Sequence, residues 1–230
     1  MPMRRLPVIA VALAVAFGAS CAHAADNADD RCQLFPDPDT SGLGLARVTA
    51  SHRVRLNDAP RPDCPVRCSQ VRLVRGDVVL TERSRGAYVC AYFLGRDGRQ
   101  ATGWIRSSDR TPLPVRTTPP LGAWMGDWVR DENQIHLSVQ GADLAVHGEA
   151  IWYPGRRGVD SPHTGEVDGV SRPTGPSVAF VDDDCRVRLR LIGPYLVAGD
   201  NDNCGGQGVG FGGAFRRKIT VARSPRPPPR

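Results

Sequence analysis

The sequence lacks any amphipathic helix that could pack against a core. No window of useful length places apolar residues three and four positions apart, as a half-buried helix requires. Short runs instead alternate apolar and polar residues, and Gly, Asp and Pro interrupt them; the chain holds 25 Gly and 20 Pro. We therefore predict an all-β protein built from short antiparallel strands.

Motifs of the common hydrolases are missing as well, since neither G-x-S-x-G nor H-E-x-x-H occurs. The run "GVGFGG" at residues 208–213 matches the glycine fingerprint of dinucleotide-binding folds. No helix is predicted after it, and the chain ends too soon for the acidic residue that binds the ribose. We predict a strand here, with one face formed by Val209, Phe211, Gly213 and Phe215. The chain is predicted to be no enzyme and to use no cofactor.

The only long apolar run lies near the N-terminus, and it is too short to span a bilayer. A positive start precedes this run at residues 6–17, and Ala-His-Ala at 22–24 fits a cleavage site. We predict a signal peptide over residues 1–24, a periplasmic or secreted protein, and no transmembrane span. Lipidation at Cys21 is the alternative. We favour cleavage, because Gly18 stands where lipidation needs a bulky aliphatic residue.

Lysine is nearly absent, and Lys218 is the only lysine among 30 basic residues. The formal net charge of +6 arises at the two ends of the chain, because Arg4, Arg5 and six basic residues within 216–230 leave −2 for the rest. Residues 219–230 form a basic, Pro-rich tail. Such a distribution does not make a nucleic-acid-binding face, so no nucleic acid partner is predicted.

Cysteine remains in even number once Cys21 leaves with the signal peptide. An even number in an exported chain predicts disulfides. A zinc site at Cys64 and Cys68 is disfavoured, because no second closely spaced pair completes the ligand set. The six cysteines are Cys32, Cys64, Cys68, Cys90, Cys185 and Cys204.

Proline divides the chain into two modules. The run "TPLPVRTTPPLG" at residues 111–122 carries four prolines, which neither a helix nor a central strand tolerates. We predict an N-terminal segment at 25–41 that carries Cys32, a first β-module at 42–113, a linker at 114–121 and a second β-module at 122–218.

Three short motifs follow one another in the first module. "ARVTASHRVRLNDAP" gives a strand and turn, "VRLVRGDVVLTERSRGAYVCAYF" gives a Gly-Asp turn and an aromatic strand, and Gly103, Trp104 and Ile105 begin a closing strand. In this order they resemble the bacterial SH3-like domains. The order Arg55-Leu56-Asn57 and the insertion "RPDCPVRCSQ" depart from the family pattern. The resemblance implies a small SH3-like barrel over residues 42–113.

The same resemblance implies a function, because similar domains in exported bacterial proteins bind peptidoglycan or its crosslinking peptides. The candidate residues of a binding groove are the aromatics Tyr88, Tyr92 and Trp104. In so small a barrel the alternative is that these aromatics belong to the core.

The strand "YVCAYF" also bears on the disulfides. Alternation turns Val89 toward the core and Cys90 outward, where it could bond Cys64 or Cys68 of the insertion. Cys32 would then take the remaining cysteine. Three pairings of these four cysteines are possible, and the sequence does not choose among them.

The second module contains two predicted hairpins, with turns at Gly141-Ala142 and Gly193-Pro194. The second register places Cys185 on the same face as Cys204, which predicts a disulfide between them. First and last strands at "WMGDW" and "FGGAFRR" pair in small up-and-down barrels. The module resembles lipocalins or avidins, and in general style the periplasmic lysozyme inhibitors. We predict a small antiparallel β-barrel or sandwich tied by disulfides.

The first of these hairpins raises the question of a metal site. Its register puts His136 opposite His147, with Glu149 two residues along on the same face. These groups could hold zinc or copper. We favour the alternative, an exposed polar cross-strand pair, and predict no bound metal.

The sequence therefore predicts an exported, non-catalytic binding protein whose SH3-like module recognises peptidoglycan or an envelope protein. Two alternatives remain. One is a periplasmic inhibitor or immunity protein that acts against a cell-wall hydrolase. The other is a lipocalin-like carrier, which requires a large apolar cavity in the second module. The sequence leaves the oligomeric state open.

Overall fold

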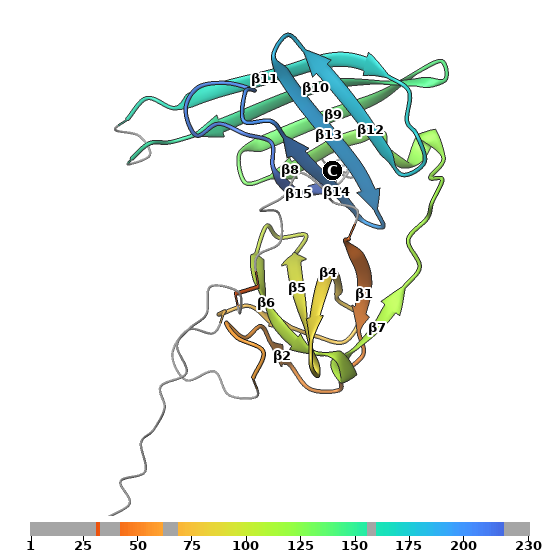
Figure 1. The fold of residues 1–230 in the computed structure, drawn as a ribbon, viewed down its shortest axis with the longest axis vertical. Coiled ribbons are helices and arrows are strands. Elements are labelled where there is room, and N and C mark those ends of the chain that lie inside the picture. The colour runs from red at the N-terminus through yellow and green to blue at the C-terminus, as the bar shows by residue number, and fades with distance from the viewer. Residues whose placement is uncertain (1–30, 33–41, 62–68, 156–159, 219–230) are drawn as a thin grey trace, which may run out of the picture.

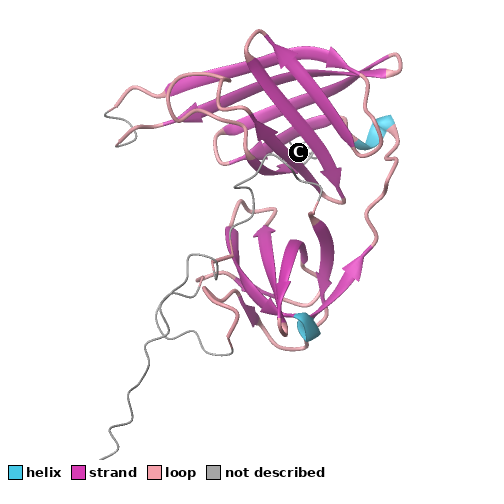
Figure 2. Ribbon diagram, viewed as in Figure 1, coloured by secondary structure: helices cyan, strands magenta, loops and turns pink. Residues whose placement is uncertain are grey.

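The computed structural model describes residues 31–32, 42–61, 69–155 and 160–218. Within them the chain is almost entirely β-structure, as predicted. Helix is limited in this part of the chain to two short 3-10 turns, η2 (Ser107–Asp109) and η3 (Leu121–Ala123), shown in Figure 2. None of the helical segments in these residues has the length and hydrophobicity needed to cross a membrane.

The first module is a five-stranded antiparallel sheet in the order β6-β5-β4-β1-β7 (Figure 1). A two-stranded hairpin, β2 (Val54–Arg55) with β3 (Arg72–Leu73), is inserted in the chain between β1 and β4 of this sheet. The strands of the sheet are β1 (Gly44–Val48), β4 (Val78–Arg85), β5 (Tyr88–Leu94), β6 (Gln100–Arg106) and β7 (Arg110–Leu113).

One face of this sheet packs on a mainly aliphatic core that includes Ala46, Val79 and Val89 together with Phe93. Every residue of β5 is buried, however, so both faces of that strand are covered. The alternation of the sequence correctly places Val89 in this core, and the second core on the other face is the unexpected feature.

The second module is a single eight-stranded antiparallel sheet in the order β11-β10-β9-β8-β15-β14-β13-β12. The first strand of the module along the chain, β8, pairs with the last, β15, as predicted. The sheet therefore curls into a barrel that is open only between β11 and β12. The strands are β8 (Gly126–Arg130), β9 (Asn133–Gln140), β10 (Asp143–Trp152), β11 (His163–Ser171), β12 (Ser177–Asp182), β13 (Cys185–Ile192), β14 (Tyr195–Asp200) and β15 (Gly213–Arg217).

The opening between β11 and β12 is bridged by a side chain. One carboxylate oxygen of Asp182 accepts a hydrogen bond from the backbone N–H of Asp168, with N and O 2.9 Å apart. Within the described residues no backbone hydrogen bond joins the two strands. The carboxylate thus satisfies an edge donor that the sheet leaves unpaired.

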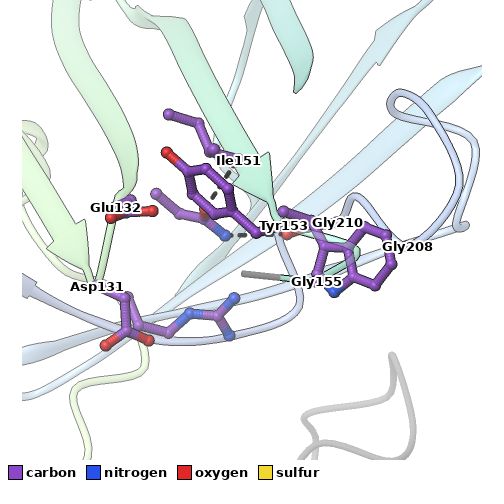
Figure 3. A pocket seen from close by; sticks show the side chains of 10 residues that line it. Asp131, Glu132, Ile151, Tyr153, Gly155, Gly208 and Gly210 are labelled. Carbon is purple, nitrogen blue, oxygen red and sulfur yellow. Dashed lines mark hydrogen bonds between the residues drawn. The ribbon is translucent and has the colours of Figure 1, made fainter. Parts of the chain in front are cut away.

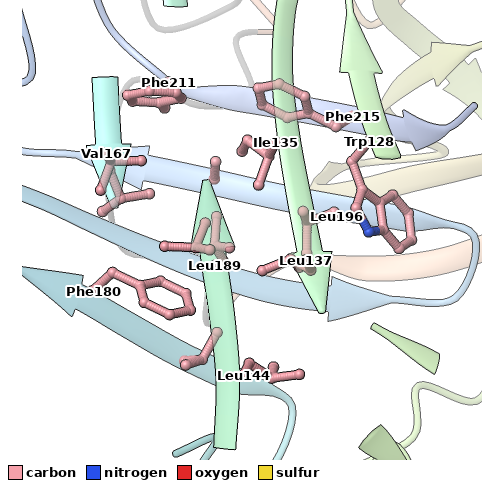
Figure 4. Packing of buried hydrophobic residues seen from close by; sticks show 14 of the residues in the cluster. Trp128, Ile135, Leu137, Leu144, Val167, Phe180, Leu189, Leu196, Phe211 and Phe215 are labelled. Carbon is pink, nitrogen blue, oxygen red and sulfur yellow. The ribbon is translucent and has the colours of Figure 1, made fainter. Parts of the chain in front are cut away.

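Side chains fill the interior of the barrel (Figure 4). The largest of them include Trp128, Phe180, Phe211 and Phe215, each at most 2% exposed. Inward residues alternate with outward ones along β13, where Val187 and Leu189 are buried and the neighbouring arginines Arg186 and Arg188 are exposed, as predicted. The interior is therefore a packed core of the kind found in small barrels.

The glycine-rich segment before the last strand corrects one prediction. The strand begins at Gly213, and residues 208–212 form no regular structure. The backbone N–H groups of Phe211 and Gly212 instead donate to the carboxylate of Asp200, the latter over 3.2 Å. Val209 and Phe211 nevertheless point into the barrel core, as the alternation indicated.

Two disulfides lie within the described residues. The predicted bond between Cys185 and Cys204 is present, and β13 and β14 pair in the predicted register, with Ile192 opposite Tyr195. The loop that carries Cys204 crosses β11 so closely that a Cβ on Gly165 would lie 1.9 Å from the Cys204 carbonyl oxygen. Only glycine fits there.

The second disulfide joins Cys32 to Cys90. The prediction that Cys90 faces solvent and bonds Cys64 or Cys68 is therefore wrong. Cys90 is fully buried, because the second module covers this face of β5. Cys64 and Cys68 lie outside the described residues, as do the predicted signal peptide and tail.

A shared apolar core joins the two modules. It combines first-module residues with Ile192, Tyr195, Val197 and Ala214 of the barrel, all fully buried. The Tyr195 hydroxyl donates to the Val78 carbonyl oxygen. Burial raises the pKa of Tyr195, so the hydroxyl keeps its proton at neutral pH.

Arg216 completes the junction. Its Nε donates to the Leu94 carbonyl oxygen over 2.7 Å, and its guanidinium lies over the Tyr195 ring, 4.5 Å from the centroid. The charged group is thus paired with a carbonyl and an aromatic face inside the interface.

Replacing both Cys185 and Cys204 by alanine should lower the free energy of unfolding by about 3 kcal/mol, because the bond closes a loop with a sequence separation of 19. Urea titration of the oxidised parent and the double variant measures this. A loss below about 1 kcal/mol would show that the loop is held by other contacts.

Tyr195→Phe should destabilise the chain by about 1–2 kcal/mol, because it leaves the Val78 carbonyl without its donor. Tyr88→Phe is the matched control, since Tyr88 lies in the same apolar core and its hydroxyl forms no hydrogen bond within the described residues. Equal midpoints of denaturation for the two variants would show that the Tyr195 hydroxyl contributes nothing to the junction.

Candidate functional site

The three predicted groove aromatics are buried: Tyr88 is 8% exposed, Tyr92 is 6% exposed and Trp104 is 0% exposed. All three belong to the core between the modules. The structure therefore supports the alternative assignment to the core, and no groove opens to solvent at these residues.

The two histidines of the first barrel hairpin lie opposite each other, as the register predicted. Each binds a different carboxylate: His136 Nδ1 lies 2.7 Å from Asp127 Oδ1, and His147 Nδ1 lies 2.9 Å from Asp168 Oδ1. Glu149 lies 3.8 Å from His147 Nε2. No group of three metal-binding side chains occurs in the part of the chain that the structure describes. These residues form an exposed, charge-paired surface.

A pocket of about 330 Å³ opens at one end of the barrel (Figure 3). Three segments far apart in the sequence surround it: the turn between β8 and β9, the end of β10 and the glycine segment before β15. The lining side chains are polar on the first segment, with Arg130, Asp131 and Glu132, and aromatic on the second, with Trp152 and Tyr153.

Asn133 holds the three segments together at the bottom of the pocket. Its side chain is 7% exposed. Its Oδ1 accepts from the Ile151 N–H over 2.9 Å, and its Nδ2 donates to the Gly210 carbonyl oxygen over 3.1 Å. A single buried amide thus connects the β8–β9 turn to β10 and to the glycine segment, which explains why this polar residue is buried.

Trp152 is the one tryptophan of the four that reaches solvent, at 38% exposure. Gly208 packs against its ring: a Cβ on Gly208 would lie 2.8 Å from Cδ2, and the backbone there has φ of 81°. The His163 ring lies beside it, 5.4 Å away between centroids. Gly208, the first glycine of the "GVGFGG" run, therefore permits close packing on the Trp152 indole.

Arg130 forms the wall opposite. It donates to the Gly212 carbonyl oxygen and lies 5.3 Å from the centroid of the Phe215 ring. Burial lowers the pKa of Arg130, and nearby Asp131 and Asp200 oppose that shift. Its Nε has no hydrogen-bond partner within the described residues.

The first module holds one of the pocket residues in place. Gln100 of β6 donates from Nε2 to the carboxylate of Asp131, with the shorter distance 3.1 Å, and accepts from the Tyr92 hydroxyl over 2.9 Å. Asp131 sits in the β8–β9 turn with a positive φ of 52°. The turn that lines the pocket is thus fixed from outside the barrel.

Sequence reasoning missed this pocket. The adjacent Asp131-Glu132 and Trp152-Tyr153 pairs were its only local signal, and their proximity depends on the pairing of β8, β9 and β10. Comparison of the chain with protein-family models, with curated proteins and with solved structures found no significant match. The assignment of the site therefore depends on its geometry.

The pairing of His147 with Asp168 can be tested through the pKa of His147. The hydrogen bond that protonated His147 donates from Nδ1 to the Asp168 carboxylate raises the pKa of His147 above 6.5. Because the folded-state pKa is raised, the pair stabilises the fold fully below about pH 6.5, and this stabilisation is lost as pH rises through the higher pKa. The effect on stability is small, because the pair is exposed.

Asp168→Asn should therefore bring the pKa of His147 down, as measured by NMR titration of the ring protons. Glu149→Gln is the control and should lower it less, because this carboxylate is farther from the ring. A titration curve of His147 that is unchanged in Asp168→Asn would contradict the pairing.

Proposed function

We propose that the chain is an exported, non-catalytic protein that binds glycan strands of the cell envelope in the pocket at the barrel end. The observation that carries this proposal is the exposed indole of Trp152 beside a pocket lined by charged and aromatic side chains. A sugar ring presents an apolar face and a rim of hydroxyl groups. An aromatic side chain suits the face, and carboxylate and guanidinium groups suit the rim.

The size of the pocket supports a small ligand or one end of a polymer. Its volume of about 330 Å³ lies at the lower end of the range usual for small-molecule sites. The lining is mostly polar on one side only, so a bound ring would have a defined orientation. Asp131 and Glu132 would accept hydrogen bonds from hydroxyl groups, and Arg130 would donate them.

In this proposal the first module is an SH3-like domain with a structural role. The strand order β6-β5-β4-β1-β7, the inserted β2–β3 hairpin and the 3-10 turn before the last strand support the resemblance. The face that carries Tyr88, Tyr92 and Trp104 packs against the barrel, so the module positions the barrel pocket and does not itself hold the ligand.

Export is supported by the predicted signal peptide and by the disulfides. Disulfides such as Cys32–Cys90 and Cys185–Cys204 persist in oxidising compartments outside the cytoplasm. The carrier alternative is not favoured, because aromatic and aliphatic side chains occupy the barrel interior where a lipocalin-like ligand would sit.

The test uses the chain without its predicted signal peptide, residues 25–230, and soluble peptidoglycan fragments of two to four sugars. Trp152 should become protected from acrylamide quenching on binding, since the other three tryptophans are at most 2% exposed. Trp152→Ala should weaken binding about tenfold, corresponding to about 1.4 kcal/mol of lost stacking.

Val170→Ala is the control, because this residue is 56% exposed and its strand position points outward on β11. It should bind like the parent. Unchanged binding in Trp152→Ala would place the ligand elsewhere. If no fragment binds while the chain inhibits a muramidase or amidase, the inhibitor hypothesis should replace this one.

A further inference from the structure

Strands β12, β13 and β14 are adjacent in the barrel sheet (Figure 1). A second concave site lies over them, on the outside of the barrel. Its volume is about 290 Å³, and it shares no lining residue with the pocket at the barrel end. The groove exists because small residues flank Arg188 on both sides: the register places Ala179 of β12 and Gly199 of β14 opposite it. Val181, 64% exposed, forms an apolar edge.

Two arginines stand over this groove. Arg186 and Arg188 are two residues apart on β13, so both side chains point outward, and both are exposed. Within the residues that the structure describes, neither guanidinium forms an ion pair or a side-chain hydrogen bond. Each therefore retains a full set of donors for a ligand.

The remaining polar groups of the groove are already engaged. The Asp200 carboxylate accepts from the N–H groups of Phe211, Gly212 and Asp202. Asn201 accepts from the Arg186 N–H over 2.9 Å and donates to the Asp184 carbonyl oxygen over 2.8 Å. The groups left to bind a ligand are thus two cations above an apolar surface.

Another part of the outer barrel surface shows the contrast. There polar side chains are paired with each other, as in His136 with Asp127 and Arg172 with Asp143. The groove differs in its combination of features: two arginines without an ion-pair partner among the described residues stand beside an exposed valine and a concave apolar floor.

We propose that this groove binds a monomeric amphipathic anion, a carboxylate or phosphate group attached to an alkyl chain. The guanidinium groups of Arg186 and Arg188 pair with the anionic head, and the alkyl chain covers Ala179 and Val181. A single bound molecule fits the dimensions of the groove, whereas a membrane surface would need a broader basic patch.

The probe is octyl phosphate, kept below its micelle concentration and titrated calorimetrically into residues 25–230. Inorganic phosphate, octyl glucoside and vesicles of anionic phospholipid are the comparison ligands. We expect one saturable site for octyl phosphate, and binding at least about tenfold weaker for each comparison ligand, since each lacks the charge, the chain or the monomeric form.

Arg188→Gln should weaken octyl phosphate binding about tenfold, through loss of a charge-assisted hydrogen bond. Ala179→Leu should also weaken it, because the larger side chain fills the groove from an exposed position on the edge strand. Arg47→Gln is the matched control, because Arg47 is an exposed arginine on a strand of the other module. Circular dichroism and thermal midpoints verify that all three fold like the parent.

Several outcomes would overturn the proposal. Equal affinity for inorganic phosphate would remove the role of the apolar floor, and equal affinity for octyl glucoside would remove the role of the arginines. Binding to anionic vesicles without binding to monomeric octyl phosphate would indicate a membrane surface instead. Retained binding in both Arg188→Gln and Ala179→Leu would place the anion elsewhere. None of these results depends on whether glycans bind at the barrel end.

Discussion

The apolar contact between the two modules is the constraint on which the rest of the structure depends. It buries Tyr195 and Ile192 of the barrel against the face of the first sheet that carries Tyr92 and Trp104. It also brings Gln100 to the β8–β9 turn, which lines the candidate site. Because this core spans both modules, neither can change position without exposing large aromatic side chains to water.

This contact also determines which surfaces of the first module are accessible to solvent. The first module is small, and its aromatic face is buried in this contact. The two candidate sites both lie on the eight-stranded barrel, one at its end and one on its outer face. The pocket at the barrel end is nevertheless connected to the first module by the hydrogen bond from Gln100 to Asp131, although that module supplies none of the lining residues.

Local sequence patterns predicted much of the second module. A two-residue turn fixes strand register, and register placed Cys185 near Cys204 and His136 opposite His147. The prediction for Cys90 was wrong, because alternation shows on which face of the strand a side chain lies but not whether that face is covered by other residues. In β5 both sides are covered, and the covering residues come from more than 90 positions later in the chain.

The candidate site could not be predicted from the sequence for a related reason. Trp152 and Asp131 come close only when β8, β9 and β10 have paired. The glycine segment lines the pocket with irregular backbone, whereas its alternating pattern predicted a strand. The glycine-rich run does permit another group to approach the backbone closely. The sequence did not show that this group is the indole of Trp152, which packs against Gly208. A pocket formed by irregular segments leaves no periodic trace in a sequence.

The carboxylate of Asp182 at the opening of the barrel has a consequence for the behaviour of the protein at high concentration. Two exposed strand edges would ordinarily recruit the edges of other copies and lead to aggregation. Here one edge donor is occupied by the Asp182 carboxylate, and Glu166 adds negative charge along β11. Copies approaching edge to edge would bring like charges together, so the open barrel can remain unclosed without growing into a continuous sheet.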